Sequence, residues 1–189
     1  MLTAVDPLPH RPRRIIVAGV SGVGKTTLAR RIAEIAHVPH TEIDALFHGP
    51  EWTPRPTFLA EVRDLVARDA WVTEWQYSEA RPLLTARADT LVWLDLPFWT
   101  TTFPRVVRRT AGRRMRRQPL WNGNVEPPFH TILIDREHIV RWAVSTRHKY
   151  RRRIPVLDAD VGPLTVVRLR SSRDVETWMT GALTDAVAP

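Results

Sequence analysis

An eight-residue motif near the start of the chain constrains its fold more than any other feature. Residues 19–26 read Gly-Val-Ser-Gly-Val-Gly-Lys-Thr and match the pattern Gly-x-x-x-x-Gly-Lys-Ser/Thr in full. An apolar, β-branched run precedes the motif at 14–18, and apolar residues recur at helical spacing from Lys25 to about Ala36. Because glycines let the backbone close around a phosphate at the positive end of a helix, the motif predicts a phosphate loop between a buried strand and a helix.

The residues of this loop have separate expected roles. We expect Lys25 to reach the β- and γ-phosphate oxygens of ATP as a mobile point charge, and the hydroxyl of Thr26 to ligate Mg²⁺. ATP and Mg²⁺ are thus the expected cofactors. The alternative is a glycine-rich turn from strand to helix that binds no ligand. The expected cofactor-binding residues are Gly19, Ser21, Gly22, Val23, Gly24, Lys25, Thr26 and Thr27.

Composition excludes several other classes of protein. The 189 residues suit one domain, and 43% hydrophobic residues suffice for a core. Cysteine is absent, which excludes disulfide frameworks, thiolate zinc sites and a cysteine nucleophile. No apolar run approaches the ~20 residues of a membrane span, so we expect no membrane partner and a cytoplasmic location. Three prolines in residues 1–13 predict a flexible leader, which leaves 14–189 as a single domain.

Short apolar strands alternate with helical patterns along the rest of the chain. This alternation predicts βαβ units, and therefore an α/β fold of three layers in which helices cover both faces of a parallel sheet. Strands are expected at about 14–18, 40–43, 71–73, 90–96 and 164–169. Helices are expected at about 25–36, 57–68, 80–87, 101–117, 135–152 and 174–183.

Several motifs beyond the phosphate loop carry a family resemblance. They are Ile43-Asp44-Ala45-Leu46, Trp52-Thr53-Pro54, Trp71-Val72, Ala88-Asp89-Thr90-Leu91-Val92-Trp93-Leu94-Asp95-Leu96-Pro97 and Leu120-Trp121-Asn122-Gly123-Asn124. With the loop, they resemble the small P-loop kinases of the nucleoside-monophosphate and shikimate kinase type. The resemblance is closer to the bacterial adenylate-kinase-like proteins often labelled topology modulation proteins, and it spans about residues 14–180. It implies a five-stranded parallel sheet, ATP-dependent phosphoryl transfer, and a lid that lies with its flanking helices at about 101–152.

One tetrapeptide departs from that family. The family has Asp-Gly-Asn-Tyr after the third strand, whereas this chain has Glu74-Trp75-Gln76-Tyr77. A tryptophan in place of glycine reshapes the acceptor pocket, so the departure argues mildly against ordinary adenylate kinase activity and leaves the acceptor open.

Three carboxylates lie at the C-terminal ends of expected strands, at the sheet edge where ligand crevices open in parallel sheets. Asp44 follows the second strand, where an acid in shikimate-kinase-like enzymes contacts the acceptor hydroxyl or a metal-bound water. We expect Asp44 to orient the acceptor or act as its base, with an N-cap or turn role as the alternative. Glu74 is expected to bind the acceptor or support Mg²⁺, with a salt-bridged strand end as the alternative. For Asp95 a structural role at the strand end is preferred over direct metal binding.

Basic charge is concentrated in two stretches of a chain whose net charge is +8. Seven of the thirteen residues from 105 to 117 are arginines. Arg105 and Arg109 are similar to the arginines that enter the lid of adenylate kinases, and we expect at least one of them to contact ATP and the pair to act in catalysis. The alternative is a solvated charge run. The second stretch, 147–153, either complements a helix C-terminus or supplies lid arginines, and the tract at 120–129 is expected to belong to the lid.

Two functions fit these features. The preferred one is a Mg-ATP-dependent kinase whose catalytic residues are Lys25, Asp44, Arg105 and Arg109 and whose acceptor is an unidentified small molecule or nucleotide. The alternative is an ATP-binding, nucleic-acid-associated regulatory protein without kinase activity. Nucleic acid is possible because of the arginines, although no RNA- or DNA-binding motif accompanies them.

Overall fold

The computed structural model describes residues 1–115, 124, 143–159 and 162–188, except for the side chains of residues 113 and 114. Four parallel strands form its sheet in the order β2-β1-β3-β4. β1 lies inside the sheet and pairs with both β2 and β3 through Ile15, which is in register with Val72 and Thr90. The strands are β1 (Arg14–Gly19), β2 (Trp71–Glu74), β3 (Thr90–Leu94) and β4 (Thr165–Leu169).

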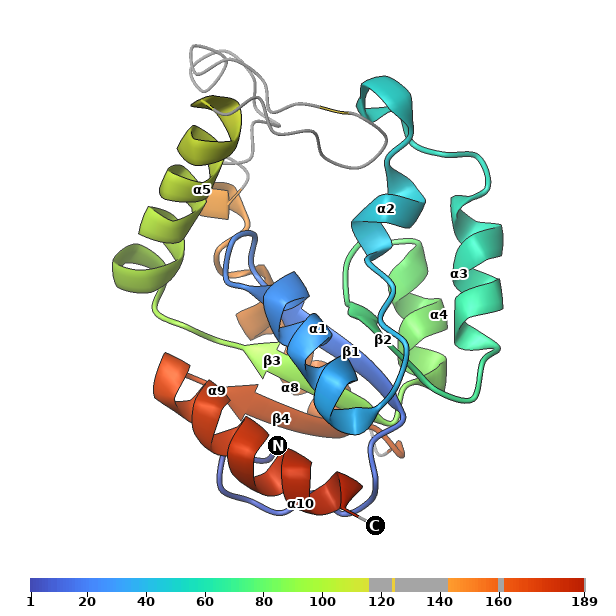
Figure 1. Ribbon diagram of the computed structural model, residues 1–189, viewed down its shortest axis with the longest axis vertical. Coiled ribbons are helices and arrows are strands. Elements are labelled where there is room, and N and C mark those ends of the chain that lie inside the picture. Colours follow the sequence, from blue (N-terminus) through green and yellow to red (C-terminus); the bar gives the residue numbers. More distant parts are fainter. Residues whose placement is uncertain (116–123, 125–142, 160–161, 189) are drawn as a thin grey trace.

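Helices cover the sheet on both faces, as Figure 1 shows. α1 packs on β1 and β2 and contacts the C-terminal helices, whereas α4 and α8 lie on the opposite face, where Tyr150 meets Trp75. The larger helices are α1 (Lys25–Ala36), α3 (Phe58–Val66), α4 (Ala80–Arg87), α5 (Phe103–Met115) and α8 (Lys149–Ala159). The smaller ones are α2 (Ile43–Phe47), a 3-10 turn (Pro50–Trp52), a π turn (Phe98–Thr102), α9 (Ser172–Trp178), a second π turn (Met179–Leu183) and α10 (Thr184–Val187).

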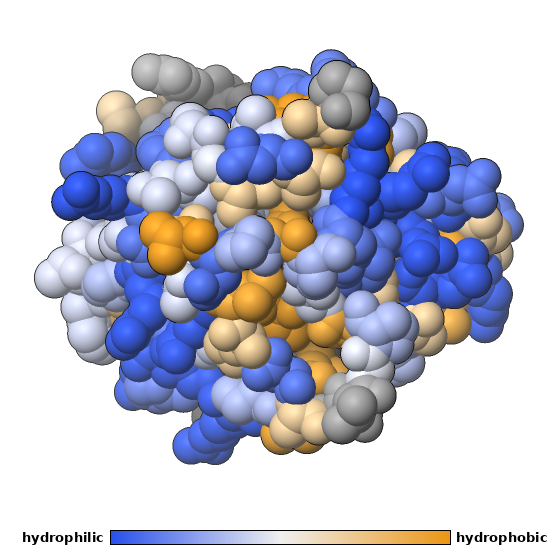
Figure 2. Space-filling view, turned by 90° about the horizontal axis from the view of Figure 1, so that it is seen from below, coloured by the Kyte–Doolittle hydropathy of each residue, from blue (hydrophilic) through white to orange (hydrophobic). Residues whose placement is uncertain are grey.

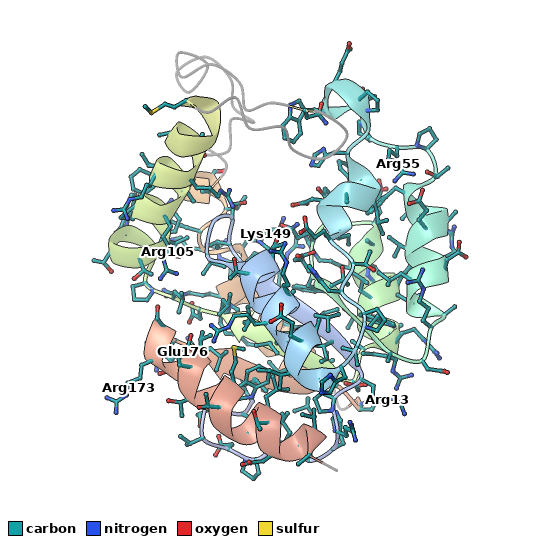
Figure 3. The ribbon with its side chains drawn as sticks, viewed as in Figure 1. Arg13, Arg55, Arg105, Lys149, Arg173 and Glu176 are labelled. Carbon is teal, nitrogen blue, oxygen red and sulfur yellow. The ribbon has the colours of Figure 1, made fainter. Side chains whose placement is uncertain are left out.

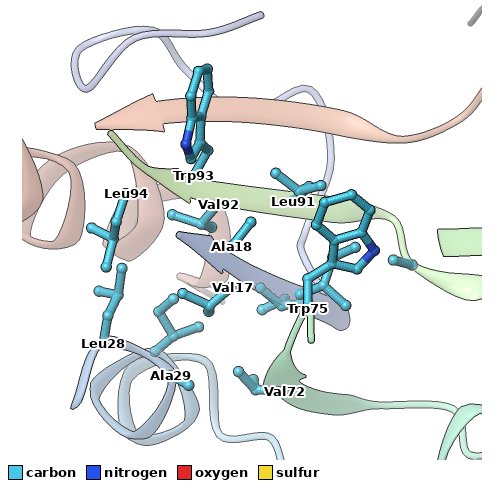
Figure 4. Close-up of a cluster of buried hydrophobic side chains, with 14 of the residues drawn as sticks. Val17, Ala18, Leu28, Ala29, Val72, Trp75, Leu91, Val92, Trp93 and Leu94 are labelled. Atoms are coloured by element: carbon cyan, nitrogen blue, oxygen red, sulfur yellow. The ribbon is translucent and has the colours of Figure 1, made fainter. Parts of the chain in front are cut away.

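Successive side chains of each strand point to opposite faces of the sheet, so the core is divided between the two layers of helices. Leu28 and Ala29 of α1 face Val17 from below in Figure 4, while Trp93 points to the other side of the sheet. Every residue of β3 is buried, as expected for a parallel strand covered on both faces. The predicted three-layer α/β fold is therefore confirmed.

The prediction of five strands is wrong at the segment expected as the second strand. In the described part of the chain, the segment expected as the second strand, 40–43, contributes a single bridge between His40 and Val72. The chain then leaves the sheet, because the backbone N–H of Ile43 donates to the carboxylate of Glu74 at 3.0 Å rather than to a neighbouring strand. α2 begins at that residue, so the sheet formed by the described residues has four strands and not five.

The leader contacts the sheet. Leu2 bridges to Val167 of β4, and its N–H donates to the carbonyl of Val166 at 2.7 Å. Further along, the leader and the C-terminal helices line a cavity of about 460 Å³, whose walls include Val5, Leu8 and Ala182. Figure 2 shows apolar side chains in the middle of the face seen from below, with hydrophilic side chains around them.

Two expected helices differ from the structure in the lid region. The helix expected at 101–117 follows a π turn and spans α5. Of the helix expected at 135–152, residues 143–145 are helical, a turn occupies 146–148, and α8 then continues to Ala159. Apart from Asn124, the expected lid tract at 120–129 lies outside the described residues.

Candidate active site

The phosphate loop joins β1 to α1 and packs against α5. Gly22 has φ 76°, and a Cβ on it would lie 2.0 Å from Cγ2 of Val106 on α5. Gly24 has φ 109° and precedes α1, where its carbonyl accepts from the N–H of Leu28 at 2.9 Å. Side chains with a Cβ rarely adopt these conformations, so the glycines of the motif are required by the backbone of the loop.

Lys25 lies inside this loop. Its side chain is buried, with 7% of the residue exposed, and Nζ donates to the carbonyl of Val20 at 3.3 Å. Burial lowers the pKa of Lys25 to about 8, while the carboxylates of Asp44 and Glu74 act in the opposite direction. Arg109 repels the lysine and adds to the lowering. The fold thus places four predicted site residues close enough to interact electrostatically.

Glu74, at the end of β2, joins the segment before α2 to the phosphate loop. Only 1% of it is exposed, and its carboxylate accepts from Ile43 N–H at 3.0 Å and lies 3.3 Å from His40 Nε2. Burial alone would raise the pKa of Glu74, but bonds from His40, Ile43 and the hydroxyl of Thr26 outweigh it and hold the pKa below its ordinary value. Glu74 therefore carries a negative charge beside the hydroxyl expected to ligate Mg²⁺.

Asp44 occupies the first turn of α2, which corrects its expected place at a strand end. Its Oδ1 accepts from Gln76 Nε2 at 2.8 Å and from the Tyr77 hydroxyl at 2.6 Å. Burial raises the pKa of Asp44, against the lowering effects of Tyr77 and Lys25. The carboxylate is fixed between the loop after β2 and the lysine of the phosphate loop, a position suited to a hydroxyl acceptor.

Tyr77, which bonds to this acid, belongs to a group of packed aromatic rings. Phe47 stacks on Tyr77 with ring centroids 3.9 Å apart, and His48 lies edge-on to Trp52 at 5.0 Å. Asn124 joins the same group, because it accepts from the N–H of Trp52 at 3.0 Å and donates to the carbonyl of Gly49 at 2.8 Å. The expected lid tract thereby contacts the loop that follows α2.

Asp95 forms ion pairs with two arginines. Its Oδ1 accepts from Arg151 Nε at 2.9 Å, and its Oδ2 accepts from Arg168 Nε at 3.0 Å and from Nη2 of the same residue. The guanidinium of Arg168 also lies 4.6 Å from the ring centroid of Trp93. Both oxygens are thus used to join β3 to α8 and β4, in agreement with the preferred structural role.

The two arginines of α5 that were predicted as site residues differ in what they contact. Arg105 is exposed and its Nη2 donates to the Ser172 hydroxyl at 3.3 Å, which joins α5 to the start of α9. Arg109, one helical turn later, is exposed and acts on the charge of Lys25. Figure 3 shows Arg105 on α5 and Lys149 nearer the centre of the molecule, between α5 and α2. Of Arg113 and Arg114 only the backbone is described, and 116–117 lie outside the described residues.

The remaining motif residues differ in accessibility. Ser21 and Thr26 are half-buried, Val23 is buried and packs beneath Gly19, and Thr27 is exposed on α1. Next to the loop, a cavity of about 270 Å³ is lined by Val20 and by residues of β3, the π turn and the start of α8. Within the described residues, no three His, Asp or Glu side chains converge on a metal position, and no helix could cross a membrane.

Three side chains near Asp44 were not predicted as site residues: Gln76, Tyr77 and His48. Gln76 and Tyr77 belong to the tetrapeptide after β2; Tyr77 matches the family pattern and Gln76 departs from it, and this comparison was the available signal. His48 carried no such signal, because its position depends on how α2 leaves the sheet.

No known family model matches the sequence. Among solved structures, the chain is similar to a gluconokinase from Sinorhizobium meliloti 1021, with TM-score 0.53 and 21% identity over 94% of this chain and 95% of that one. It is also similar to a shikimate kinase from Bacteroides thetaiotaomicron, with TM-score 0.50 and 13% identity over 89% of this chain and 95% of that one. This chain has the fold of the small P-loop kinases. The predicted resemblance to kinases of the nucleoside-monophosphate and shikimate type is confirmed at that level.

Proposed function

We propose that this protein is a Mg-ATP-dependent phosphotransferase of the adenylate-kinase-like P-loop class that acts on a small-molecule or nucleotide acceptor. The observation that carries the proposal is the grouping of Lys25, Thr26, Asp44 and Glu74 at one edge of the sheet. A lysine and a hydroxyl beside two carboxylates suit a phosphate, its Mg²⁺ and a hydroxyl acceptor.

The loop residues fit a bound nucleotide. Gly22 and Gly24 allow the positive φ angles that curve the backbone of the loop, and Lys25 is already directed into it. Thr26 would ligate Mg²⁺, with the ionised Glu74 supporting that position. MgATP, when bound, supplies the phosphoryl group that is transferred.

The acceptor residues lie on the other side of Lys25. In the proposal, Asp44 orients the acceptor hydroxyl and takes its proton, while Gln76 and Tyr77 hold the carboxylate in place. Arg105 and Arg109 contact ATP and offset the charge that develops during transfer. The aromatic rings packed with Tyr77 exclude water from the acceptor.

The test is ADP release from Mg·ATP at moderate salt across nucleoside monophosphates, nucleosides, sugars, sugar acids and other hydroxy acids. Lys25→Ala serves as the blank. We expect one acceptor class to raise ADP release well above the blank, and Asp44→Asn to reduce acceptor-dependent turnover more than ATP binding. Tight ATP binding with no stimulated turnover would contradict the kinase. Salt-sensitive binding of RNA or DNA would then favour the nucleic-acid-associated alternative.

A further inference from the structure

A cluster of cations comes from α4 and α8, beside Trp75. Its central member is Arg81, a residue that is only 7% exposed. Within the described part of the chain, no acceptor lies within hydrogen-bond distance of its Nε, and no carboxylate forms an ion pair with its guanidinium. A buried guanidinium without a carboxylate is unusual, because burial of an uncompensated charge is costly.

Two further cations, Lys149 and Arg153 of α8, lie within electrostatic range of Arg81. The pKa of Lys149 falls to about 8, first because of burial and then because Arg81 and Arg153 repel its charge. The pKa of Arg81 is itself lowered by burial and by Arg153. The first turn of α8 holds no acidic residue, although the positive end of a helix dipole favours one. Arg81, which has no carboxylate partner among the described residues, thus lies in a positive environment that favours an anion.

Trp75 and Tyr150 support the side chain of Arg81. The guanidinium of Arg81 lies 5.3 Å from the ring centroid of Trp75, and the Trp75 indole N–H donates to the Thr85 hydroxyl at 2.9 Å. Tyr150 packs against the same indole with ring centroids 6.0 Å apart. Stacking on Trp75 holds the planar fork of Arg81 in place without using its N–H donors, which leaves them for an oxyanion.

The cluster also borders the acceptor side of the candidate active site. The Tyr150 hydroxyl donates to the carbonyl of Trp75 at 3.4 Å, and the next residue, Gln76, donates to Asp44. The pKa of Tyr150, raised to about 12 by burial, is lowered by Arg81 and raised by Asp44. Tyr150 thus has Asp44 and the cations both within electrostatic range.

We propose that Arg81, Lys149 and Arg153 form an oxyanion site that binds a carboxylate or phosphate group of the acceptor. The assignment to the acceptor rests on the proposed kinase function, whereas the anion site itself does not. The acceptor is then a molecule with a hydroxyl at Asp44 and an anionic group at Arg81.

The chain offers a direct probe of this site, because Lys25 and Lys149 are its only lysines. Reductive methylation with ¹³C-formaldehyde keeps the lysine charge, and in Lys25→Met the only labelled side chain is that of Lys149. The probes are inorganic phosphate and malonate, titrated separately, with sodium chloride at equal ionic strength as the reference. A Lys149 signal that shifts saturably, with a rising pKa, supports the site, and the two titrations decide between phosphate and carboxylate. A shift no larger than that in chloride overturns it.

Variants locate the anion. Arg81→Gln should weaken the saturable binding about tenfold or more, the expected loss of a charge-assisted contact. Arg87→Gln, on the exposed side of the same helix, should leave it unchanged. If Arg81→Gln fails to fold, Arg153→Gln against Arg152→Gln provides the same comparison at two exposed positions of α8. Equal binding by Arg153→Gln and Arg152→Gln, or by Arg81→Gln and Arg87→Gln, contradicts the proposal.

An activity measurement tests the link to the acceptor separately. In unmethylated protein, Arg81→Gln should raise the KM for the acceptor about tenfold and leave the KM for ATP unchanged. Saturable phosphate or malonate binding without any kinase activity would contradict the proposed function while leaving the anion site standing. Kinase activity with an unchanged acceptor KM in Arg81→Gln would refute the assignment to the acceptor.

Discussion

The hydroxyl of Tyr77 donates a 2.6 Å hydrogen bond to Oδ1 of Asp44. Tyr77 has φ 55°, so the backbone after β2 is turned sharply to bring the ring over α2. The stacked ring of Phe47 fixes the phenol from the other side. The acid is therefore held by a residue from a different segment, and its ionisation depends on that contact.

Tyr77→Phe should move the acidic limb of kcat/KM to higher pH. The bond from Tyr77 stabilises the ionised form of Asp44 and lowers its pKa, so its removal leaves the raising effect of burial less opposed. A base must be ionised to accept a proton, and activity will need a higher pH. The matched control is Tyr150→Phe, whose hydroxyl bonds to a carbonyl instead. pH–rate profiles of both variants check this. If the acidic limbs of Tyr77→Phe and Tyr150→Phe lie at the same pH, Asp44 is not the base.

Lys25→Met should stabilise the protein at neutral pH while abolishing turnover. The folded state lowers the pKa of Lys25 from 10.5 to about 8, so the unfolded chain binds more protons between these values. The free energy of unfolding of the wild type therefore rises with pH across that window. The destabilisation caused by the buried charge is fully present below pH 8. This destabilisation amounts to roughly 3 kcal/mol at neutral pH. Urea unfolding at pH 7 and pH 10 measures it, and an advantage of Lys25→Met that fails to shrink at pH 10 would contradict the burial of the charge.

Gly22→Ala should destabilise the fold by about 1–3 kcal/mol and weaken ATP binding, because the added Cβ collides with Val106. The double variant Gly22→Ala, Val106→Ala should recover part of the loss, although the strain at φ 76° persists. Gly112→Ala on α5 is the control, since a Cβ there meets nothing within 4 Å. Additive losses in the double-mutant cycle would show that α5 does not pack on the loop.

Local patterns in the sequence were enough to predict much of the fold. The phosphate loop with its flanks and the helix 80–87 were predicted because their signals lie within a dozen residues. The prediction of the second strand was wrong because the partner of Ile43 N–H is Glu74, 31 residues away. The contact of Leu2 with Val167 and the anchoring of Asp44 by Tyr77 are likewise products of the closed fold. The candidate site residues could be named from the sequence, whereas the contacts between them could not be predicted.

Arg109→Ala should weaken ATP binding or slow transfer, whereas Arg108→Ala should do neither. Arg109 acts on the charge of Lys25, so its removal should also raise the pKa of that lysine. Steady-state kinetics at varied ATP measure the first effect, and ¹³C-methyl-lysine titration measures the second. Equal kinetics for the two variants would show that the arginines on this face of α5 are a solvated charge run without a role in ATP binding or transfer.

Asp95→Asn should lower stability and leave the Mg²⁺ dependence of turnover unchanged. Both carboxylate oxygens bind arginines, so the neutral amide loses two charge-assisted contacts and leaves Arg151 and Arg168 unpaired. Because these arginines are partly exposed and water screens them, the loss should be about 1–3 kcal/mol. Asp158→Asn, which breaks a pair with the chain's amino terminus, should cost under ~1 kcal/mol. Thermal unfolding and a Mg²⁺ titration of kcat check both parts. A raised Mg²⁺ requirement at unchanged stability would make Asp95 part of the metal site instead.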